Sequence, residues 1–400
     1  MTVRGLLVGV ALGVLVGAGV VGSASPHAVR RPADRVLRAI RRARASAAIT
    51  QTQADTYRAT YLSARREVRR LSGLRARELR SAIAIIRGIA RRGSLRARCM
   101  ALVFLTLRRN VQWWSLHGPP PPGSALEPAA QGRRCKPLKP EAHAANLTFP
   151  GSGIVYEYYP RRGLQLQVNA TFGSVNTLLA EGSPASVAQA GATLDEMLPL
   201  ASRRHGVLTW EYEFPFEGAL PPWTSGLSQA TAIEAFTRAA LRLGRPGYLS
   251  VALRLARLFA VAPPAGVRVR LRRRDWFLLY SFAPHQLVLN ADLDALIALR
   301  DLRGATHAAF VATLARSGLR ALNRNIARFN TGRWSRYALG GPPASLNYHA
   351  LNLELAQELC QRTRDSAVCR AAHSFERELN TRCPLTKHRA DEAGPAALKP

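Results

Sequence analysis

Apolar residues recur at spacings of three and four along most of this chain, which is the periodicity of helices that pack by one face. Near the N-terminus, Tyr57, Tyr61 and Ala64 follow this spacing, and charged residues occupy the other faces. The same pattern predicts two further helices, at about residues 79–92 and 95–114. The N-terminal segment is therefore expected to be helical.

The second half of the chain shows helix patterns in pairs that are joined by short turns. The helices are expected at residues 186–204, 225–243, 248–259, 287–302, 305–327, 346–361 and 366–379. A strand is expected at 206–214 and a hairpin at 266–282, where strand-forming residues replace the helical period. Helix pairs interrupted by hairpins are typical of an incomplete (α/α) toroid, which commonly carries its site on the loops that enter the inner helices. The predicted fold class is mainly α.

A small β module is expected before the helix pairs. Apolar and amide side chains alternate there: Leu164, Leu166 and Val168 against Gln165, Gln167 and Asn169. The sequence "PRRG" just before this alternation is typical of a hairpin turn.

Shifts in composition divide the chain into segments. They are an apolar leader (1–25), an Arg-rich helical segment (26–116), a Pro-rich linker (117–146), the β-hairpin module (147–182), the toroid (183–385) and a tail (386–400). The leader has an uninterrupted apolar run from Leu6 to Val21, so it is expected to be a signal peptide cleaved after Ala24 or Ser25, or an uncleaved anchor. An extracytoplasmic protein is predicted, and a membrane contact only if the anchor remains.

The formal net charge is +32, and residues 26–115 contribute 22 arginines against four acids. Such a charge suggests an acidic partner. Nucleic acid is not expected, because no nucleic-acid recognition motif accompanies the charge. The Arg-rich segment is either a solvated basic helical surface or a platform for an anionic polymer or lipid headgroups.

Five cysteines form no CxxC pair, so no zinc site is expected. In an exported protein Cys360 and Cys369 could join two consecutive helices, and an odd number leaves at least one thiol over. The chain contains no phosphate-binding loop, dinucleotide fingerprint, HExxH or GxSxG in a suitable context. We therefore predict no cofactor and no metal.

Tyr280, Tyr337 and Tyr348 each lie at the edge of a predicted loop or hairpin. A single tyrosine is usually a packed aromatic residue with a satisfied hydroxyl group. The segments that contain these three are more informative together. They are "PPWTSGLSQATAIEAFTRA" (221–239), "DWFLLYSFAPHQLVLN" (275–290), "FNTGRWSRYALG" (329–340) and "SLNYHALNLELAQEL" (345–359).

The order and wording of these segments resemble the C-terminal domain of the D-glucuronyl C5-epimerases, which act on heparin and heparan sulfate uronates. The resemblance covers about residues 205–365. It implies Tyr280 and Tyr348 as a facing acid/base pair, with Tyr337 assisting. It also leads us to expect substrate contacts from Arg336, Arg333, His349, Trp223, Gln229, Gln165, Gln167 and Asn290.

Tyrosines suit this chemistry because C5 epimerisation removes a proton α to a carboxylate and returns one to the opposite face. A phenol with a pKa of ~10 needs a neighbouring cation to act as a base at neutral pH. The sequence departs from the family at Leu278 and Leu279, which replace two glutamates, and at Gly340, which replaces an arginine. Arg333 or Arg336 is the expected substitute for that arginine, followed by the Arg272–Arg274 turn.

The predicted function is C5 epimerisation of glucuronate to iduronate in an acidic polysaccharide, without a cofactor. A uronate polysaccharide lyase shares the first step and stays an alternative. A catalytically degenerate module that binds acidic glycans is a second alternative, which Leu279 and Gly340 would favour. A homodimer is left open.

Overall fold

The computed structural model describes residues 34–123, 128–133, 135, 143–204 and 206–385. The predicted leader (1–25) and tail (386–400) lie outside these ranges. None of the described helices is long and apolar enough to cross a membrane.

The N-terminal helices are α1 (Arg35–Ala45), α2 (Gln51–Arg70), α3 (Gly73–Arg91) and α4 (Ala97–Leu116). They bury their apolar stripes against one another and share a core of their own. Helix α2 begins at a capping box, in which the Thr50 hydroxyl accepts from the Gln53 N–H and the Gln53 side chain accepts from the Thr50 N–H. Helix α1 was not predicted, although Val36, Ala39 and Ile40 follow helical spacing and are buried.

The Arg-rich segment is attached to the rest of the protein by buried side chains. The Glu78 carboxylate accepts from the N–H groups of Arg161 and Gly163 at 3.1 and 3.2 Å. The Asn110 side chain exchanges hydrogen bonds with the N–H and carbonyl of Leu164 at 2.9 and 2.8 Å. These partners belong to the hairpin of β3 (Tyr156–Tyr159) and β4 (Gly163–Leu166). Only the outer surface of the segment is therefore the solvated basic surface that composition suggests.

The predicted β module is shorter than expected, because residues 168–181 form helix α5 (Val168–Glu181). The prediction of β structure there was wrong. Gln167 ends the alternation by capping the helix, since its side-chain oxygen accepts from the Asn169 N–H at 3.3 Å. From that point Phe172, Val175 and Leu179 recur at helical spacing and are buried.

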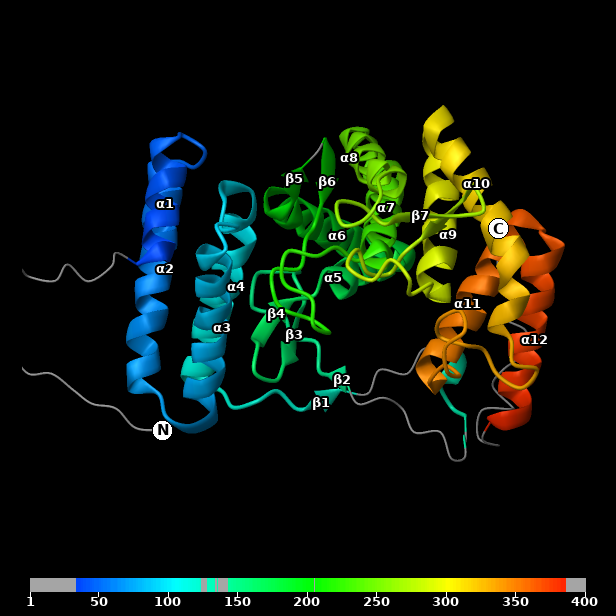
Figure 1. The fold of residues 1–400 in the computed structure, drawn as a ribbon, viewed down its shortest axis with the longest axis horizontal. Helices are drawn as coiled ribbons and strands as arrows, with labels where there is room; N and C mark the ends of the chain where they lie inside the picture. The colour runs from blue at the N-terminus through cyan, green and yellow to red at the C-terminus, as the bar shows by residue number, and fades with distance from the viewer. Residues whose placement is uncertain (1–33, 124–127, 134, 136–142, 205, 386–400) are drawn as a thin grey trace, which may run out of the picture. The chain divides into compact units, whose positions relative to one another are not determined.

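The described helices from α5 onward form successive pairs (Figure 1). The pairs are α5 with α6 (Pro184–Met197), α7 (Gly226–Arg242) with α8 (Gly247–Ala256), α9 (Leu289–Thr306) with α10 (Ala309–Asn325), and α11 (Leu346–Thr363) with α12 (Ser366–Arg382). The first members also pack in series, α5 on α7, α7 on α9 and α9 on α11. Because the first members lie inside and α7 and α9 are buried on most sides, the predicted incomplete (α/α) toroid is confirmed.

Short antiparallel hairpins and 3₁₀ turns connect these helices. The hairpins are β1 (Pro122–Gly123) with β2 (His143–Ala144), β5 (Ser202–Arg204) with β6 (Val207–Thr209), and β7 (Arg268–Leu271) with β8 (Arg274–Phe277). The 3₁₀ turns are η1 (Pro128–Ala130), η2 (Leu198–Leu200), η3 (Arg257–Ala260) and η4 (Ile326–Phe329). The β7–β8 hairpin was predicted at this place.

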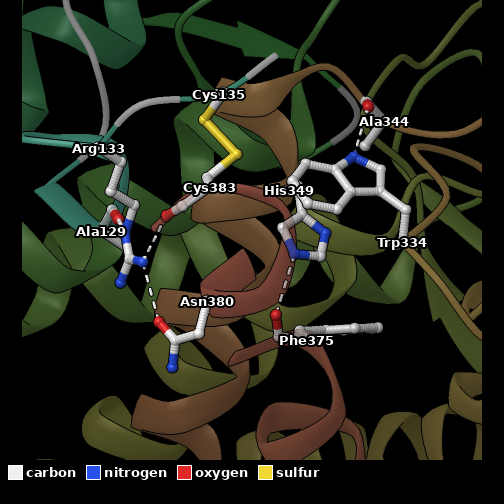
Figure 2. The surroundings of a disulfide bond; sticks show 9 residues. All are labelled: Ala129, Arg133, Cys135, Trp334, Ala344, His349, Phe375, Asn380 and Cys383. Carbon is white, nitrogen blue, oxygen red and sulfur yellow. Dashed lines mark hydrogen bonds between the residues drawn. A yellow bond between two sulfur atoms is a disulfide. The ribbon is translucent and has the colours of Figure 1, made fainter. Parts of the chain in front are cut away.

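Two disulfides tie the C-terminal helices. Cys360–Cys369 joins α11 to α12, the pairing that the sequence suggested. Cys135–Cys383, at a sequence separation of 248, ties the linker to the end of α12 and was not predicted (Figure 2). Arg133 reinforces this tie, because its guanidinium donates to the Asn380 side chain at 2.9 Å and to the Cys383 carbonyl at 3.0 Å (Figure 2). Cys99 is buried and stays a thiol.

Candidate active site

A cavity of about 490 Å³ opens where the inner helices of the toroid begin. First-turn residues of α5, α7, α9 and α11 line it: Asn169, Ala170, Leu227, Ser228, Asn290, Asn347 and Tyr348. Each helix N-terminus carries a partial positive charge from its aligned peptide dipoles. The cavity is therefore electrostatically suited to an anionic group.

The three predicted tyrosines come together at this cavity. The rings of Tyr337 and Tyr348 are 4.6 Å apart, Tyr280 is hydrogen-bonded to Tyr337, and both Tyr280 and Tyr348 line the cavity. Trp223, also predicted, packs edge-on against Tyr280 at 5.9 Å and stacks on Tyr212 at 4.2 Å. The structure thus brings these residues close together, and their roles stay predictions.

Backbone hydrogen bonds between distant segments hold the tyrosines in place. The Gly226 N–H donates to the Leu279 carbonyl at 2.8 Å, and the Leu289 N–H donates to the Tyr337 carbonyl at 3.1 Å. A Cβ atom at Gly226 would lie 2.1 Å from the Leu278 carbonyl oxygen, so only glycine allows this close approach. The start of α7 and the start of α9 therefore fix Tyr280 and Tyr337 directly.

Burial keeps these phenols protonated. It raises the pKa of Tyr280, and burial followed by the neighbouring Tyr280 and Tyr348 raises that of Tyr337 still further. The hydroxyl groups of Tyr280 and Tyr337 are hydrogen-bonded to each other. At neutral pH both phenols are hydrogen-bond donors or acids.

A second polar wall comes from the β3–β4 hairpin, where Gln167 was among the predicted substrate contacts and Glu157 and Tyr159 were not. Oε2 of Glu157 accepts from the Tyr159 hydroxyl and from Nε2 of Gln167, both at 2.8 Å. Oε1 of Gln167 accepts from the Tyr212 hydroxyl at 2.7 Å, and Ser228 lies 2.9 Å from the same hydroxyl. All five line the cavity. The only available signal was a lone acid within an aromatic strand, "YEYY".

The predicted arginine clamp does not reach the cavity. Arg336 donates to the Gly341 carbonyl and so closes its own loop, and Arg333 is exposed. Gly340 has φ +75°, a conformation that an arginine would rarely adopt, and Arg272 and Arg273 are exposed at the β7–β8 turn. Among the described residues that line the cavity there is no arginine, lysine or histidine, and Glu157 is the sole carboxylate.

Two predicted glutamines are structural instead of substrate-binding. Gln165 is buried, donates to the Arg162 carbonyl at 2.6 Å and does not line the cavity. Gln229 is 0% exposed, because its amide bonds both the N–H and the carbonyl of Trp210 at 3.1 Å. These amides complete backbone hydrogen bonds that have no other partner in the short strands.

His349 is also structural (Figure 2). Its Nε2 lies 3.0 Å from the Phe375 carbonyl, which can only accept, so Nε2 carries the proton and Nδ1 accepts from Ser335. The ring stacks on Trp334 at 3.6 Å, and burial lowers its pKa to about 4. A neutral, fully bonded imidazole does not contact a ligand.

Asn290 is the predicted residue with the most unusual surroundings. It lines the cavity in the first turn of α9 and is 0% exposed. Neither of its amide atoms has a hydrogen-bond partner among the described residues. Helix α9 also lacks a side-chain cap, because its N-cap residue is Val288. An unpaired buried amide costs about 1–3 kcal/mol per group, so it needs an explanation.

Within the described ranges, no group of three or more His, Cys, Asp or Glu residues could hold a metal ion. The arrangement offers neutral donors, helix N-termini and a single carboxylate. Such a site can bind an anion, deliver protons from phenols and accept a proton at Glu157.

Comparisons with known proteins give several partial matches. Solved structures that resemble the chain include a cellobiose 2-epimerase from Spirochaeta thermophila (12% identity, TM-score 0.40, covering 78% of this chain and 74% of that one). They also include a cellobiose 2-epimerase from Bacillus thermoamylovorans (11% identity, TM-score 0.36, covering 52% of this chain and 60% of that one). A D-mannose isomerase is similar at 14% identity and a TM-score of 0.36, covering 52% of this chain and 58% of that one. The chain spans about three fifths of the length of the last two. Residues 204–377 match the model of the D-glucuronyl C5-epimerase C-terminus. Over these residues the chain therefore matches the D-glucuronyl C5-epimerase C-terminal family.

Proposed function

We propose that this protein epimerises C5 of glucuronate residues in an acidic polysaccharide, giving iduronate. The observation that carries the proposal is that Tyr280 and Tyr348 line one cavity, with Tyr337 packed against Tyr348, in a domain that matches an epimerase family. Epimerisation at C5 needs a proton donor on one face of the sugar ring and a proton acceptor on the other.

In this proposal the buried phenols supply the proton that returns to C5. Tyr280 and Tyr348 face the ring from the toroid side, and the hydrogen bond between Tyr337 and Tyr280 orients Tyr280. Their raised pKa values suit Tyr280 and Tyr337 to proton donation more than to proton removal. A stronger base must therefore act from elsewhere in the cavity.

The substrate carboxylate gathers negative charge when the C5 proton leaves, so it needs stabilisation. We place it at the N-terminus of α9, where the unpaired Asn290 amide and the uncapped first turn offer neutral donors. The neighbouring N-termini of α5, α7 and α11 add favourable potential. In this proposal these donors perform the role of the family's arginine, at whose position this chain has Gly340.

A binding module without turnover is a second candidate. It is favoured by the lack of a cation among the described lining residues and by Leu278 and Leu279, whose side chains are buried in apolar surroundings. A module would keep affinity for acidic glycans and exchange no protons.

The deciding experiment is incubation of the protein with heparosan in D₂O. An epimerase places solvent deuterium at C5, which NMR and mass spectrometry detect, and Tyr280→Phe lowers the rate by about 10²-fold or more. Binding without exchange, across several glucuronate polymers, would favour the module. A new ultraviolet absorbance from a C4–C5 double bond would identify a lyase.

We also propose that the protein works outside the cytoplasm. The disulfides Cys135–Cys383 and Cys360–Cys369 fit an oxidising compartment. Labelling of thiols in denatured, unreduced protein isolated from cells would show one reactive cysteine if both disulfides are formed, and five if neither is.

A further inference from the structure

Glu157 is placed as a functional group instead of a structural one. It comes from β3, lines the cavity and is the sole carboxylate among the described residues that do so. Its Oε2 accepts the Tyr159 hydroxyl proton at 2.8 Å, and Nε2 of Gln167 donates to the same oxygen at 2.8 Å. The carboxylate is thus held in one orientation against a phenol that also lines the cavity.

Tyr159 is held as firmly as the tyrosines of the toroid. Its ring packs on Phe214 at 4.9 Å and edge-on against Phe216 at 6.3 Å, and Tyr280 contacts Phe216 at 5.8 Å. Nε2 of Gln167 also donates to the Tyr159 oxygen at 3.0 Å. Tyr159 and Tyr280 therefore approach the cavity from the hairpin and from the toroid respectively, and both contact Phe216.

Proton removal at C5 needs a base, and the phenols of this cavity are poor ones. Burial raises the pKa of Tyr159 and Tyr280, and that of Tyr212 to about 12. No cation lines the described part of the cavity to favour a phenolate. A carboxylate that takes the phenol proton at the same moment removes this difficulty, because a free phenolate never has to form.

We propose that Tyr159 and Glu157 form the proton-abstracting pair of this site. The proposal rests on the function proposed above. The C5–H bond of the uronate breaks, its electron pair moves into the carboxylate group as an enediolate, and the proton bonds to the Tyr159 oxygen. The original Tyr159 proton passes to Oε2 of Glu157. Tyr280 then protonates C5 from the opposite face and regains its proton from solvent, and Glu157 releases to solvent the proton that it accepted.

This pair supplies a carboxylate in place of the family's two glutamates, at whose positions this chain has Leu278 and Leu279. The carboxylate is supplied from β3, about 120 residues earlier in the chain, instead of from the segment before Tyr280. The hairpin that carries it is fixed to α3 and α4 by Glu78 and Asn110. Such support from neighbouring elements is what a catalytic pair requires.

The test measures deuterium incorporation at C5 of heparosan at saturating substrate. Glu157→Gln keeps the shape of the side chain and should lower the rate by 10²-fold or more. Tyr159→Phe should lower it similarly, and the double variant should be no slower than either single variant, because the two residues act as one unit. Added formate should restore part of the rate to Glu157→Ala, which a purely structural role would not allow.

Glu181→Gln is the matched control, because Glu181 is exposed at the end of α5 and does not line the cavity. Its rate should stay within about twofold of the wild type. Wild-type exchange that survives in Glu157→Gln would overturn the pair and leave the proposed function standing. A change in KM alone would reduce Glu157 to a binding contact. Lack of exchange in the wild type would overturn both proposals.

Discussion

Buried carboxylates behind the cavity make the stability of this protein depend on pH in an unusual direction. Glu234 of α7 and Asp294 of α9 are both less than 9% exposed, and Arg238 lies 3.2 Å from Glu234. The Thr231 hydroxyl lies 3.2 Å from Asp294 and 3.0 Å from Asn169, which lines the cavity. The pair therefore sits directly beneath the candidate active site.

Burial, followed by the nearby Glu358, raises the pKa of Asp294 from 3.8 to about 7. Burial and the neighbouring Asp294 also raise the pKa of Glu234. Between about pH 4 and 7 the folded protein keeps a proton that the unfolded chain has lost. The free energy of unfolding therefore decreases as pH rises through this interval. Above it, the ionised Asp294 lowers stability by roughly 4 kcal/mol.

Asp294→Asn removes this penalty, because an amide oxygen can still accept from Thr231. We expect the variant to match the wild type at pH 4 and to exceed it by up to about 4 kcal/mol at pH 8. Urea denaturation from pH 4 to 8 measures this difference. Asp195→Asn is the control: Arg245 donates to this exposed carboxylate and lowers its pKa, so the variant should lose a little stability above pH 4. Parallel wild-type and Asp294→Asn curves would refute the reasoning.

Three other changes test the site and its supports. Gly226→Ala should destabilise the protein by about 3 kcal/mol or more, because the new Cβ meets the Leu278 carbonyl at 2.1 Å; an unchanged melting temperature would contradict this. Asn110→Leu should lower the free energy of unfolding by about 2–5 kcal/mol in chemical denaturation, because it removes the hydrogen-bond partners of the Leu164 backbone and of the Trp114 indole. A loss below about 1 kcal/mol would argue that Asn110 does not anchor the hairpin. Asn290→Asp, introduced into the Tyr280→Phe protein, should weaken the affinity for heparosan oligosaccharides at least tenfold by calorimetry. The reason is that the new Asp carboxylate faces the substrate carboxylate. Equal weakening toward carboxyl-reduced oligosaccharides would show that charge is not the reason.

Much of the fold could be predicted because the helical period is strong wherever one face is buried. Helices α7, α9, α11 and α12 begin and end within a few residues of the predicted bounds. Helix α5 was missed because its first residues continue the alternation of the strand, and Asn169 and Thr171 are weak helix formers. What decided its structure was the Gln167 cap and packing on α7, which a local pattern does not contain.

The candidate site was predictable only where one segment carried several features at once. Tyr280, Tyr337 and Tyr348 stood in recognisable motifs, and the structure brings them together. Glu157 and Tyr159 could not be found, because their place depends on how the β3–β4 hairpin docks on the toroid and on α3 and α4. The prediction that Arg333 or Arg336 binds the substrate was wrong for another reason. Arginine is abundant in this chain, so its presence near a motif says little about where its side chain points.

The docking of the hairpin also bears on how large the working unit of this protein is. The stretch that matches the epimerase family starts at residue 204, yet Glu157, Tyr159 and Gln167 precede it, and the side chains that fix their hairpin, Glu78 and Asn110, lie earlier still. A fragment cut to the homologous stretch would keep every tyrosine that marks the family and lose one whole wall of the cavity. The stretch that matches the family and the set of residues that form the cavity thus have different boundaries in this chain. The Arg-rich helices lie outside the family match, yet they support one wall of the cavity.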